Sequence, residues 1–241
     1  MTPPASSGPR GQKAHRNRLL RALPRADYQR LGPHLRALSL TFKQSLFEPL
    51  KPIPYVYFIE SAVISLVTKL DNGEVIEVAT IGNEGLAGLP VFLGAVSSPG
   101  WAFAQIPGEA LRVKAAVFRD EVGQGGGLQG LLKRYTQALF NQIAQSAACN
   151  RAHGLEQRCA RWLLMTLDRV GAPEFSLTHE FMSQMLGVRR ATVTLAAGAL
   201  QSAGYIEYRR GRVKVVDRAR LEARACGCYR VIRDEYERLV P

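Results

Sequence analysis

The chain lacks the features that mark membrane and secreted proteins. It has no apolar run of about twenty residues, so nothing in it is long enough to cross a bilayer. The first nine residues lack the apolar core of a secretory signal. Four cysteines among 241 residues do not make a disulfide framework. We therefore expect a cytoplasmic protein in a reducing compartment, with no membrane partner.

Histidine is also scarce, and this argues against catalysis. Only four histidines occur, and none lies in residues 40–118, where the sequence predicts β-strands. A β-barrel enzyme with a histidine-bound metal is therefore excluded. No Gly-x-Ser-x-Gly motif of a serine hydrolase is present. We predict that the protein is not an enzyme, and we predict neither a cofactor nor a metal.

The net charge of +12 is concentrated at the two ends of the chain. Residues 1–36 carry eight basic side chains and one acidic one, and residues 151–241 carry sixteen basic and ten acidic ones. Residues 37–150 are close to neutral, with eight basic and nine acidic side chains. A polyanion is therefore expected to bind the C-terminal part, with the N-terminal arm assisting.

The stretch Thr178–Val216 has the pattern of a helix-turn-helix followed by a β-hairpin. Thr178 can cap a helix ahead of an apolar run, and Gly187 permits the sharp turn that ends this helix. A second helix follows, with arginines and threonines near its N-terminal end, where side chains can enter the major groove of DNA. Two short strands then flank a turn at Arg210 and Gly211. A basic hairpin after a recognition helix is typical of a winged helix.

Eight side chains of this winged helix are predicted to contact DNA. Arg189 and Arg190 can each donate two hydrogen bonds to guanine and so read the base sequence. The others suit phosphate or thymine-methyl contacts, which set affinity and register. For Arg209 and Arg212, pairing with acidic groups of their own domain is the alternative. The predicted contact residues are His179, Arg189, Arg190, Thr192, Thr194, Arg209, Arg210 and Arg212.

The first half of the chain predicts a β-domain behind a short helical entry. Residues 1–16 are rich in Pro, Gly and Ser and predict a disordered basic arm, and residues 17–38 predict short helices. Many short strand-like runs then predict a sandwich or barrel, with a hairpin turn at Asp71-Asn72-Gly73. An effector pocket is predicted in the turn-rich passage that follows, at Gly85, Gly88, Phe92 and Trp101.

After a glycine-rich break at 123–127, residues 128–153 predict one long helix. Its apolar residues recur at spacings of three and four, and they form a broad stripe. Such a stripe can pack on the chain's own β-domain and on a second copy together. A homodimer seam is favoured because the helix connects a sensor-like domain to a DNA-binding end. Packing on its own domain alone is the alternative.

These features together resemble the Crp–Fnr superfamily of transcription regulators. The resemblance rests on residues 57–63, on Gly82-Asn83-Glu84-Gly85, and on the helix-turn-helix with its wing. It implies an α+β fold with an N-terminal β-roll, a cyclic-nucleotide-binding-like jelly roll, then a long dimerisation helix and a C-terminal winged helix-turn-helix. It also implies a homodimer on palindromic double-stranded promoter DNA, with RNA polymerase as a further partner.

The resemblance, which covers about residues 17–216, and the composition of the two ends together give five expected segments. They are a disordered basic arm at 1–16, a sensor domain at 17–127, a dimerisation helix at 128–153, a winged helix-turn-helix domain at 154–220 and a helical tail at 221–241.

The sequence departs from the family pattern at three places. Ala191 stands where the recognition helix usually has Glu, so the family's commonest half-site is not expected. No cysteine precedes Cys149, so an N-terminal iron–sulfur cluster of the Fnr kind is not expected. Between Gly82 and Leu111 there is no Lys or Arg to pair with a nucleotide phosphate. Cyclic AMP is therefore not expected as the effector, which stays unassigned.

Cys226 and Cys228 are the remaining oddity. We favour their interpretation as small residues that pack the C-terminal tail, over a redox switch or a metal site shared with Cys149 and Cys159. The functional alternative to a DNA-binding regulator is a ligand-binding or thiol redox-sensing module. In that case the basic end of the chain would bind RNA or a protein partner.

Overall fold

The computed structural model describes residues 11–241, so most of the predicted N-terminal arm lies outside the described residues. The part of the arm that is described is ordered, contrary to the prediction. Gln12–Ala14 form a 3-10 helix (η1), and the His15 ring contacts Glu60 Oε1 at 2.9 Å and the Tyr28 hydroxyl at 2.7 Å. The buried carboxylate of Glu60 also accepts a hydrogen bond from the backbone of Arg16. These long-range hydrogen bonds fix His15 and Arg16 on the rest of the chain, although the composition of residues 1–16 by itself predicts disorder.

The predicted short helices are present. They are α1 (Arg18–Ala22) and α2 (Arg25–Leu31), followed by a 3-10 turn, η2 (Gly32–His34). Asn17 caps α1, and Pro24 separates the two helices because a proline cannot donate a backbone hydrogen bond.

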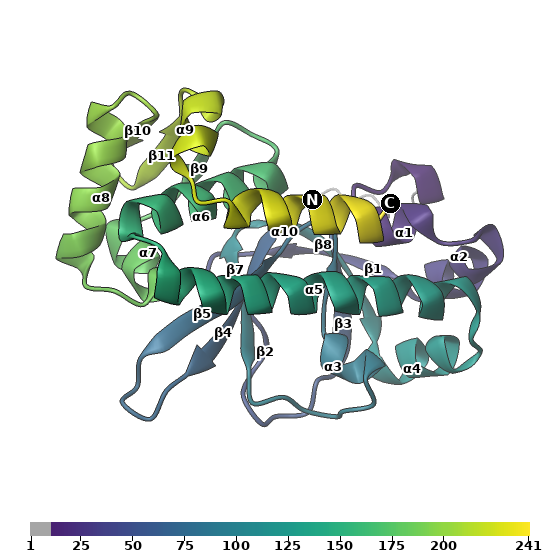
Figure 1. Ribbon diagram of the computed structural model, residues 1–241. Coiled ribbons are helices and arrows are strands. Elements are labelled where there is room, and N and C mark those ends of the chain that lie inside the picture. Colours follow the sequence, from purple (N-terminus) through teal and green to yellow (C-terminus); the bar gives the residue numbers. More distant parts are fainter. Residues whose placement is uncertain (1–10) are drawn as a thin grey trace, which may run out of the picture.

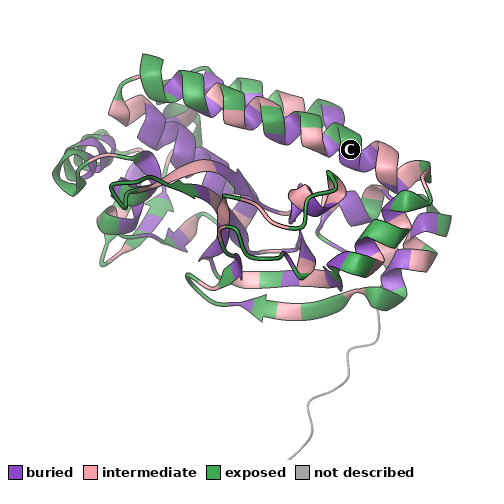
Figure 2. Cartoon of the chain, turned by 90° about the horizontal axis from the view of Figure 1, so that it is seen from below, coloured by how far each residue is buried: buried purple, intermediate pink, exposed green. Residues whose placement is uncertain are grey.

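Eight strands form the predicted β-roll as two four-stranded antiparallel sheets. One sheet has the order β1-β8-β3-β6 and the other β2-β7-β4-β5. The predicted hairpin at 71–73 joins β4 to β5, and Gly73 takes a left-handed φ of 84° there. Figure 2 shows the buried residues gathered between the sheets and on the inward sides of the helices. The strands are β1 (Arg36–Leu40), β2 (Ser45–Phe47), β3 (Tyr55–Ile59), β4 (Val63–Lys69), β5 (Val75–Ile81), β6 (Leu86–Ala87), β7 (Trp101–Ile106) and β8 (Gly108–Lys114).

Helices enclose one side of the roll and lead into the C-terminal domain (Figure 1). A short helix, α3 (Leu89–Phe92), follows β6, and α4 (Ala115–Gly123) follows β8. The long helix α5 (Gly126–Ala152) then runs along the roll, and α6 (Leu155–Val170) opens the C-terminal domain. No helix among residues 11–241 is both long enough and apolar enough to span a membrane.

The apolar stripe of α5 faces its own β-roll. The Tyr135 hydroxyl donates to the Leu86 carbonyl at 2.9 Å, and the Gln142 amide donates to the Thr80 carbonyl at 3.0 Å. The alternative of intramolecular packing therefore accounts for the buried stripe. Phe140, which is 65% exposed, lies on a different side of the helix.

After α6, the described part of the C-terminal domain contains a three-stranded sheet, β10-β11-β9, and four further helices. Helix α10 returns from the far end of the molecule and lies along α5 (Figure 1). The Asn141 amide of α5 donates to Glu235 at 2.5 Å, and Arg134 donates to the Leu239 carbonyl at 3.2 Å. The elements are β9 (Glu174–Ser176), α7 (His179–Leu186), α8 (Arg190–Ser202), β10 (Ile206–Arg209), β11 (Arg212–Val215), α9 (Arg218–Arg224) and α10 (Cys228–Leu239).

A buried ion pair joins the roll to the C-terminal domain. Arg169 of α6 contacts Glu84 Oε1 at 2.8 Å, and both side chains are buried. Gly82 and Gly85 in the same turn permit this close packing. A Cβ at Gly82 would lie 2.4 Å from the Arg169 side chain, and one at Gly85 would lie 2.4 Å from the Tyr135 ring. The Gly-Asn-Glu-Gly sequence is therefore explained by interdomain packing.

Candidate DNA-binding surface

The turn between α7 and α8 has the predicted local geometry. Thr178 caps α7, since its hydroxyl accepts a hydrogen bond from the Phe181 N–H at 3.1 Å. Gly187 ends the helix with a φ of 62°, a left-handed conformation that favours glycine. Helix α8 buries Val193 and Leu200 against the domain. Its opposite side is therefore free to meet a partner.

The N-terminal end of α8 presents the predicted base-reading residues to solvent. Arg189 precedes the helix and Arg190 begins it, and both are exposed. Thr192 is exposed on the same end. Ala191 is exposed as well, so its methyl group stands where an acceptor for cytosine would be needed.

The wing is a tight β-hairpin. Arg209 pairs with Arg212 across a two-residue turn formed by Arg210 and Gly211. Both turn residues have positive φ, 47° and 74°, which is the geometry of a type I′ turn. Arg210 thereby lies at the tip of the hairpin, in a left-handed conformation that costs a non-glycine residue about 1–3 kcal/mol.

Ion pairs distinguish the arginines that already have a carboxylate partner from those that are free to bind an anion. Five of the six arginines of α9 and α10 form ion pairs with nearby carboxylates, Arg230 being the exception; examples are Arg218 with Asp168 at 2.7 Å and Arg238 with Glu235 at 2.9 Å. Four exposed arginines on the helix-turn-helix and the wing have no ion-pair partner within residues 11–241. They are Arg189, Arg190, Arg209 and Arg210.

The structure gives Arg212 the alternative role. Its guanidinium pairs with Glu174 on the neighbouring strand β9. The pair is exposed, so it contributes little to stability, but it partly neutralises the cation. Arg212 is therefore less available to an anion than Arg209 or Arg210, which have no ion pair within residues 11–241.

The side chains of His179 and Thr194 form a hydrogen bond with each other. His179 Nδ1 lies 3.0 Å from the Thr194 hydroxyl, which lies 3.1 Å from the Arg190 carbonyl. Since the hydroxyl donates to that carbonyl, Nδ1 carries the proton that it donates to Thr194. The ring packs on Tyr208 with centroids 4.2 Å apart. Burial and the nearby Arg190 lower the pKa of His179, so the neutral ring braces α7 against α8.

The four residues of the predicted effector pocket do not line one cavity. Trp101 lines a cleft of about 690 Å³ between the β4–β5 hairpin and α7–α8, and Arg189 and Arg190 lie at its border. None of the other three residues lines this cleft. Gly85 is covered by the Tyr135 ring, and Gly88 packs against β3. Gly88 and Phe92 lie at the two ends of α3, whereas Trp101 begins β7 in the other sheet, so the predicted effector pocket stays a prediction.

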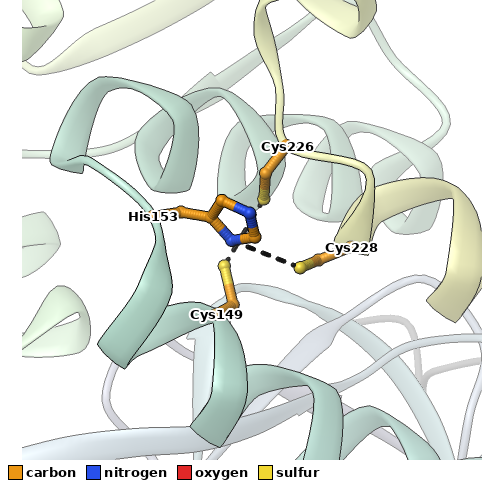
Figure 3. Close-up of side chains that lie close together, drawn as sticks. All are labelled: Cys149, His153, Cys226 and Cys228. Atoms are coloured by element: carbon orange, nitrogen blue, oxygen red, sulfur yellow. Dashed lines mark hydrogen bonds between the residues drawn. The ribbon is translucent and has the colours of Figure 1, made fainter.

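Three cysteines and a histidine that are distant in sequence come together near the domain junction (Figure 3). The ligand atoms of Cys149, His153, Cys226 and Cys228 all lie within 4.8 Å of one another. Cys159 is elsewhere, with its sulfur 3.4 Å from a methionine sulfur of α7. Cys159 therefore does not belong to this cluster, although the alternative of a shared metal site had included it, and His153 joins the cluster without having been predicted. The four-residue spacing from Cys149, which places both on one helix face, was the available signal.

Comparisons with known proteins identify the architecture. Residues 157–224 match the family model of a Crp-like helix-turn-helix domain. The whole fold resembles FixK2 from Bradyrhizobium japonicum, with a TM-score of 0.69 and 18% identity over 80% of this chain and 98% of that chain. The chain has the Crp–Fnr regulator fold. The predicted resemblance and the predicted fold class are thereby confirmed.

Two further solved structures of similar fold illustrate how divergent the sequences are. TTHB099, a Crp-family transcriptional regulator from Thermus thermophilus, has a TM-score of 0.64 and 18% identity, over 78% of this chain and 96% of that one. CLP, a c-di-GMP-responsive global regulator of Xanthomonas campestris, has a TM-score of 0.63 and 13% identity, over 80% and 99%. No curated protein sequence matches the chain.

Proposed function

We propose that this Crp–Fnr-fold protein is a homodimeric, sequence-specific regulator that binds double-stranded promoter DNA without cyclic AMP. The observation that carries the proposal is the set of four unpaired, exposed arginines on the recognition helix and the wing. Cations that lack internal partners can release counterions from DNA phosphates, which is the main source of affinity for a polyanion. RNA polymerase is the proposed second partner once the protein is bound at a promoter.

The arginines divide into two roles by position. Arg189 and Arg190 flank the start of α8, the part of a recognition helix that meets base edges. Arg209 and Arg210 lie on the wing, where phosphate contacts fix the register. Thr192 supplies a hydroxyl and a methyl group for phosphate or thymine. Arg212 and His179, with internal partners, contribute less.

The homodimer is proposed to form through the side of α5 that neither the roll nor α10 covers. Phe140 is 65% exposed there, and Ala144 and Ala147 are exposed on the same side of the helix. An exposed phenylalanine beside small residues suits close helix–helix contact. Two-fold symmetry would then present two recognition helices to half-sites about one helical turn, roughly 34 Å, apart.

Arg190→Ala and Arg210→Ala are expected to weaken DNA binding in different ways. Loss of Arg190 should remove about 1–3 kcal/mol of discrimination at one base pair, because a bidentate contact to guanine disappears. Loss of Arg210 should weaken specific and random duplexes equally and reduce the slope of log affinity against log salt by about 0.9. Fluorescence anisotropy at several salt concentrations, on a site found by footprinting the gene's own upstream DNA, measures both.

Arg238→Ala is the matched control, since this arginine is paired with Glu235 at the end of α10. It should leave affinity and salt dependence unchanged. Equal loss of specific and random binding in Arg190→Ala would contradict its role in base reading. An asymmetric footprint would contradict the dimer, and tighter binding to RNA than to duplex DNA would favour the alternative function.

Cyclic AMP and cyclic GMP are expected not to bind at millimolar concentration. A nucleotide phosphate needs a charged partner when it is buried, and residues 82–111 contain no Lys or Arg. The Tyr135 ring also fills the space over Gly85. Isothermal calorimetry with both nucleotides, and with cyclic di-GMP, checks this. Micromolar binding that tightens DNA affinity would show that the roll holds a nucleotide site.

A further inference from the structure

A compact set of soft ligands lies where α5 ends and the α9–α10 connection returns to it (Figure 3). Cys149 lies in the last turn of α5, and His153 is the C-cap residue four positions later, whose N–H donates to the Cys149 carbonyl at 3.0 Å. Cys226 and Cys228 come from the other side, separated by Gly227 just before α10. Within residues 11–241 this is the one group of His, Cys or acidic residues that was found to be close enough to hold a metal ion.

The distances already approach those of a tetrahedral metal site. The sulfurs of Cys149 and Cys226 are 3.4 Å apart, and Cys228 Sγ lies 3.5 Å from His153 Nδ1. Tetrahedral Zn²⁺, with bonds of about 2.3 Å to sulfur and 2.0–2.1 Å to nitrogen, places two sulfurs about 3.8 Å apart and sulfur and nitrogen about 3.6 Å apart. The widest separation in the group is within 4.8 Å, so a shift of about 1 Å completes the site.

The surroundings suit the charge of such a site. Three thiolates and a neutral imidazole around a divalent ion leave a net charge of −1. Arg158 and Arg161 of α6 are buried nearby, and each has an Nε with no hydrogen-bond partner within the described residues. The Gln145 amide also donates to Cys228 Sγ at 3.1 Å, the kind of outer contact that orients a metal ligand.

Simple packing explains the cluster poorly. Cys149, Cys226 and Cys228 are each at most 5% exposed, yet they form a small buried group apart from the main apolar core. No aliphatic side chain belongs to this group. A disulfide is also not formed, since all three cysteines are free and the sulfurs of Cys149 and Cys226 are 3.4 Å apart rather than about 2.05 Å.

We infer that Cys149, His153, Cys226 and Cys228 form a structural Zn²⁺ site that fixes the α9–α10 connection to the end of α5. Soft thiolates with one imidazole in tetrahedral geometry select Zn²⁺. All four positions are taken by protein side chains, so the ion has no open position for catalysis. The site lies at the α5–α6 junction, between the roll and the helix-turn-helix. This inference replaces the packing role first expected for Cys226 and Cys228, and it does not depend on DNA binding.

Metal analysis of the full chain, purified under reducing conditions without chelator, tests the site. About one zinc per chain is expected, and Co²⁺ in its place should give thiolate-to-cobalt charge transfer with the ligand-field bands of a tetrahedral site. Loss of an outer contact alone typically weakens binding 10–100-fold, so Gln145→Ala should fall in that range and His153→Ala should lose more than about 100-fold. Cys226→Ser with Cys228→Ser should abolish binding.

Cys159→Ala is the matched control, because this cysteine is buried outside the cluster, and it should keep one zinc per chain. Circular dichroism confirms that each variant is folded. Hydrogen exchange at residues 149–154 and 225–228 should rise when a chelator removes the ion. A metal-free reduced protein that does not take up Zn²⁺ would overturn the proposal. So would bound iron with sulfide, a Cys149–Cys226 disulfide in the reduced protein, or unchanged zinc in the double variant.

Discussion

Arg169→Leu is expected to lower the free energy of unfolding by about 3–5 kcal/mol. The substitution leaves the Glu84 carboxylate, 6% exposed, without its cation, and an unpaired buried charge is costly. It also removes hydrogen bonds from the guanidinium to the carbonyls of Met165 and Thr80 and to Gln142. Urea denaturation followed by circular dichroism measures the change.

Two further variants decide whether buried charge is the cause. Arg224→Leu removes an arginine whose pair with Glu156 lies at the surface, and it should cost far less stability than Arg169→Leu. Adding Glu84→Gln to Arg169→Leu should recover part of the loss, because the orphaned carboxylate is then neutral. If the double variant is less stable than Arg169→Leu, the loss comes from packing and not from charge.

The contribution of Glu77 to stability is expected to fall by up to about 3 kcal/mol as the pH rises from about 4.5 to 7. Burial raises the pKa of the Glu77 carboxyl from 4.5 to about 7. The contacts of Ser65 are consistent with a protonated Glu77. The Ser65 hydroxyl lies 2.7 Å from Glu77 Oε2 and 2.6 Å from the side-chain oxygen Oε1 of Gln105. One hydroxyl proton cannot serve both oxygens, whereas a protonated Glu77 donates to Ser65, which donates to Gln105.

The direction of this pH dependence follows from proton binding by Glu77. Between the unfolded and the folded pKa of Glu77, the folded state binds more protons, so the contribution of this group is fully present below pH 4.5 and declines until pH 7. Glu77→Gln should remove this slope while its amide still bonds Ser65 and Trp162. Denaturation midpoints at pH 5 and pH 8 test it, with exposed Glu74→Gln on the same hairpin as the control. The same decline in Glu77→Gln would show that another group titrates.

The Glu77 carboxyl also lies between the β-roll and the C-terminal domain. Trp162 of α6 donates to Glu77 Oε1 of β5 at 2.6 Å, so ionisation of Glu77 acts on the contact between the roll and the C-terminal domain. Changes of DNA affinity with pH in the same range, lost in Glu77→Gln, would connect this contact to the placement of the recognition helix.

Features fixed within a few residues could be predicted from the sequence. The cap at Thr178, the turn at Gly187 and the hairpin at Arg210-Gly211 each depend on one local backbone geometry and one residue type that permits it. The β-roll was predictable for a similar reason, because its short strands appear in the sequence as apolar and β-branched runs separated by turn residues. The composition and order of these elements were sufficient to indicate the fold.

Only the tertiary structure decided which surfaces meet. The stripe on α5 is equally suited to a β-roll or to a second helix, and the structure places it on the roll, with α10 along another side. Arg212 and Arg210 look alike in sequence, yet only Arg212 has an acid on the adjacent strand. His153 joins Cys226 and Cys228 across more than seventy residues. Such contacts depend on how distant elements fold together, and the apolar pattern of one element does not encode its partner.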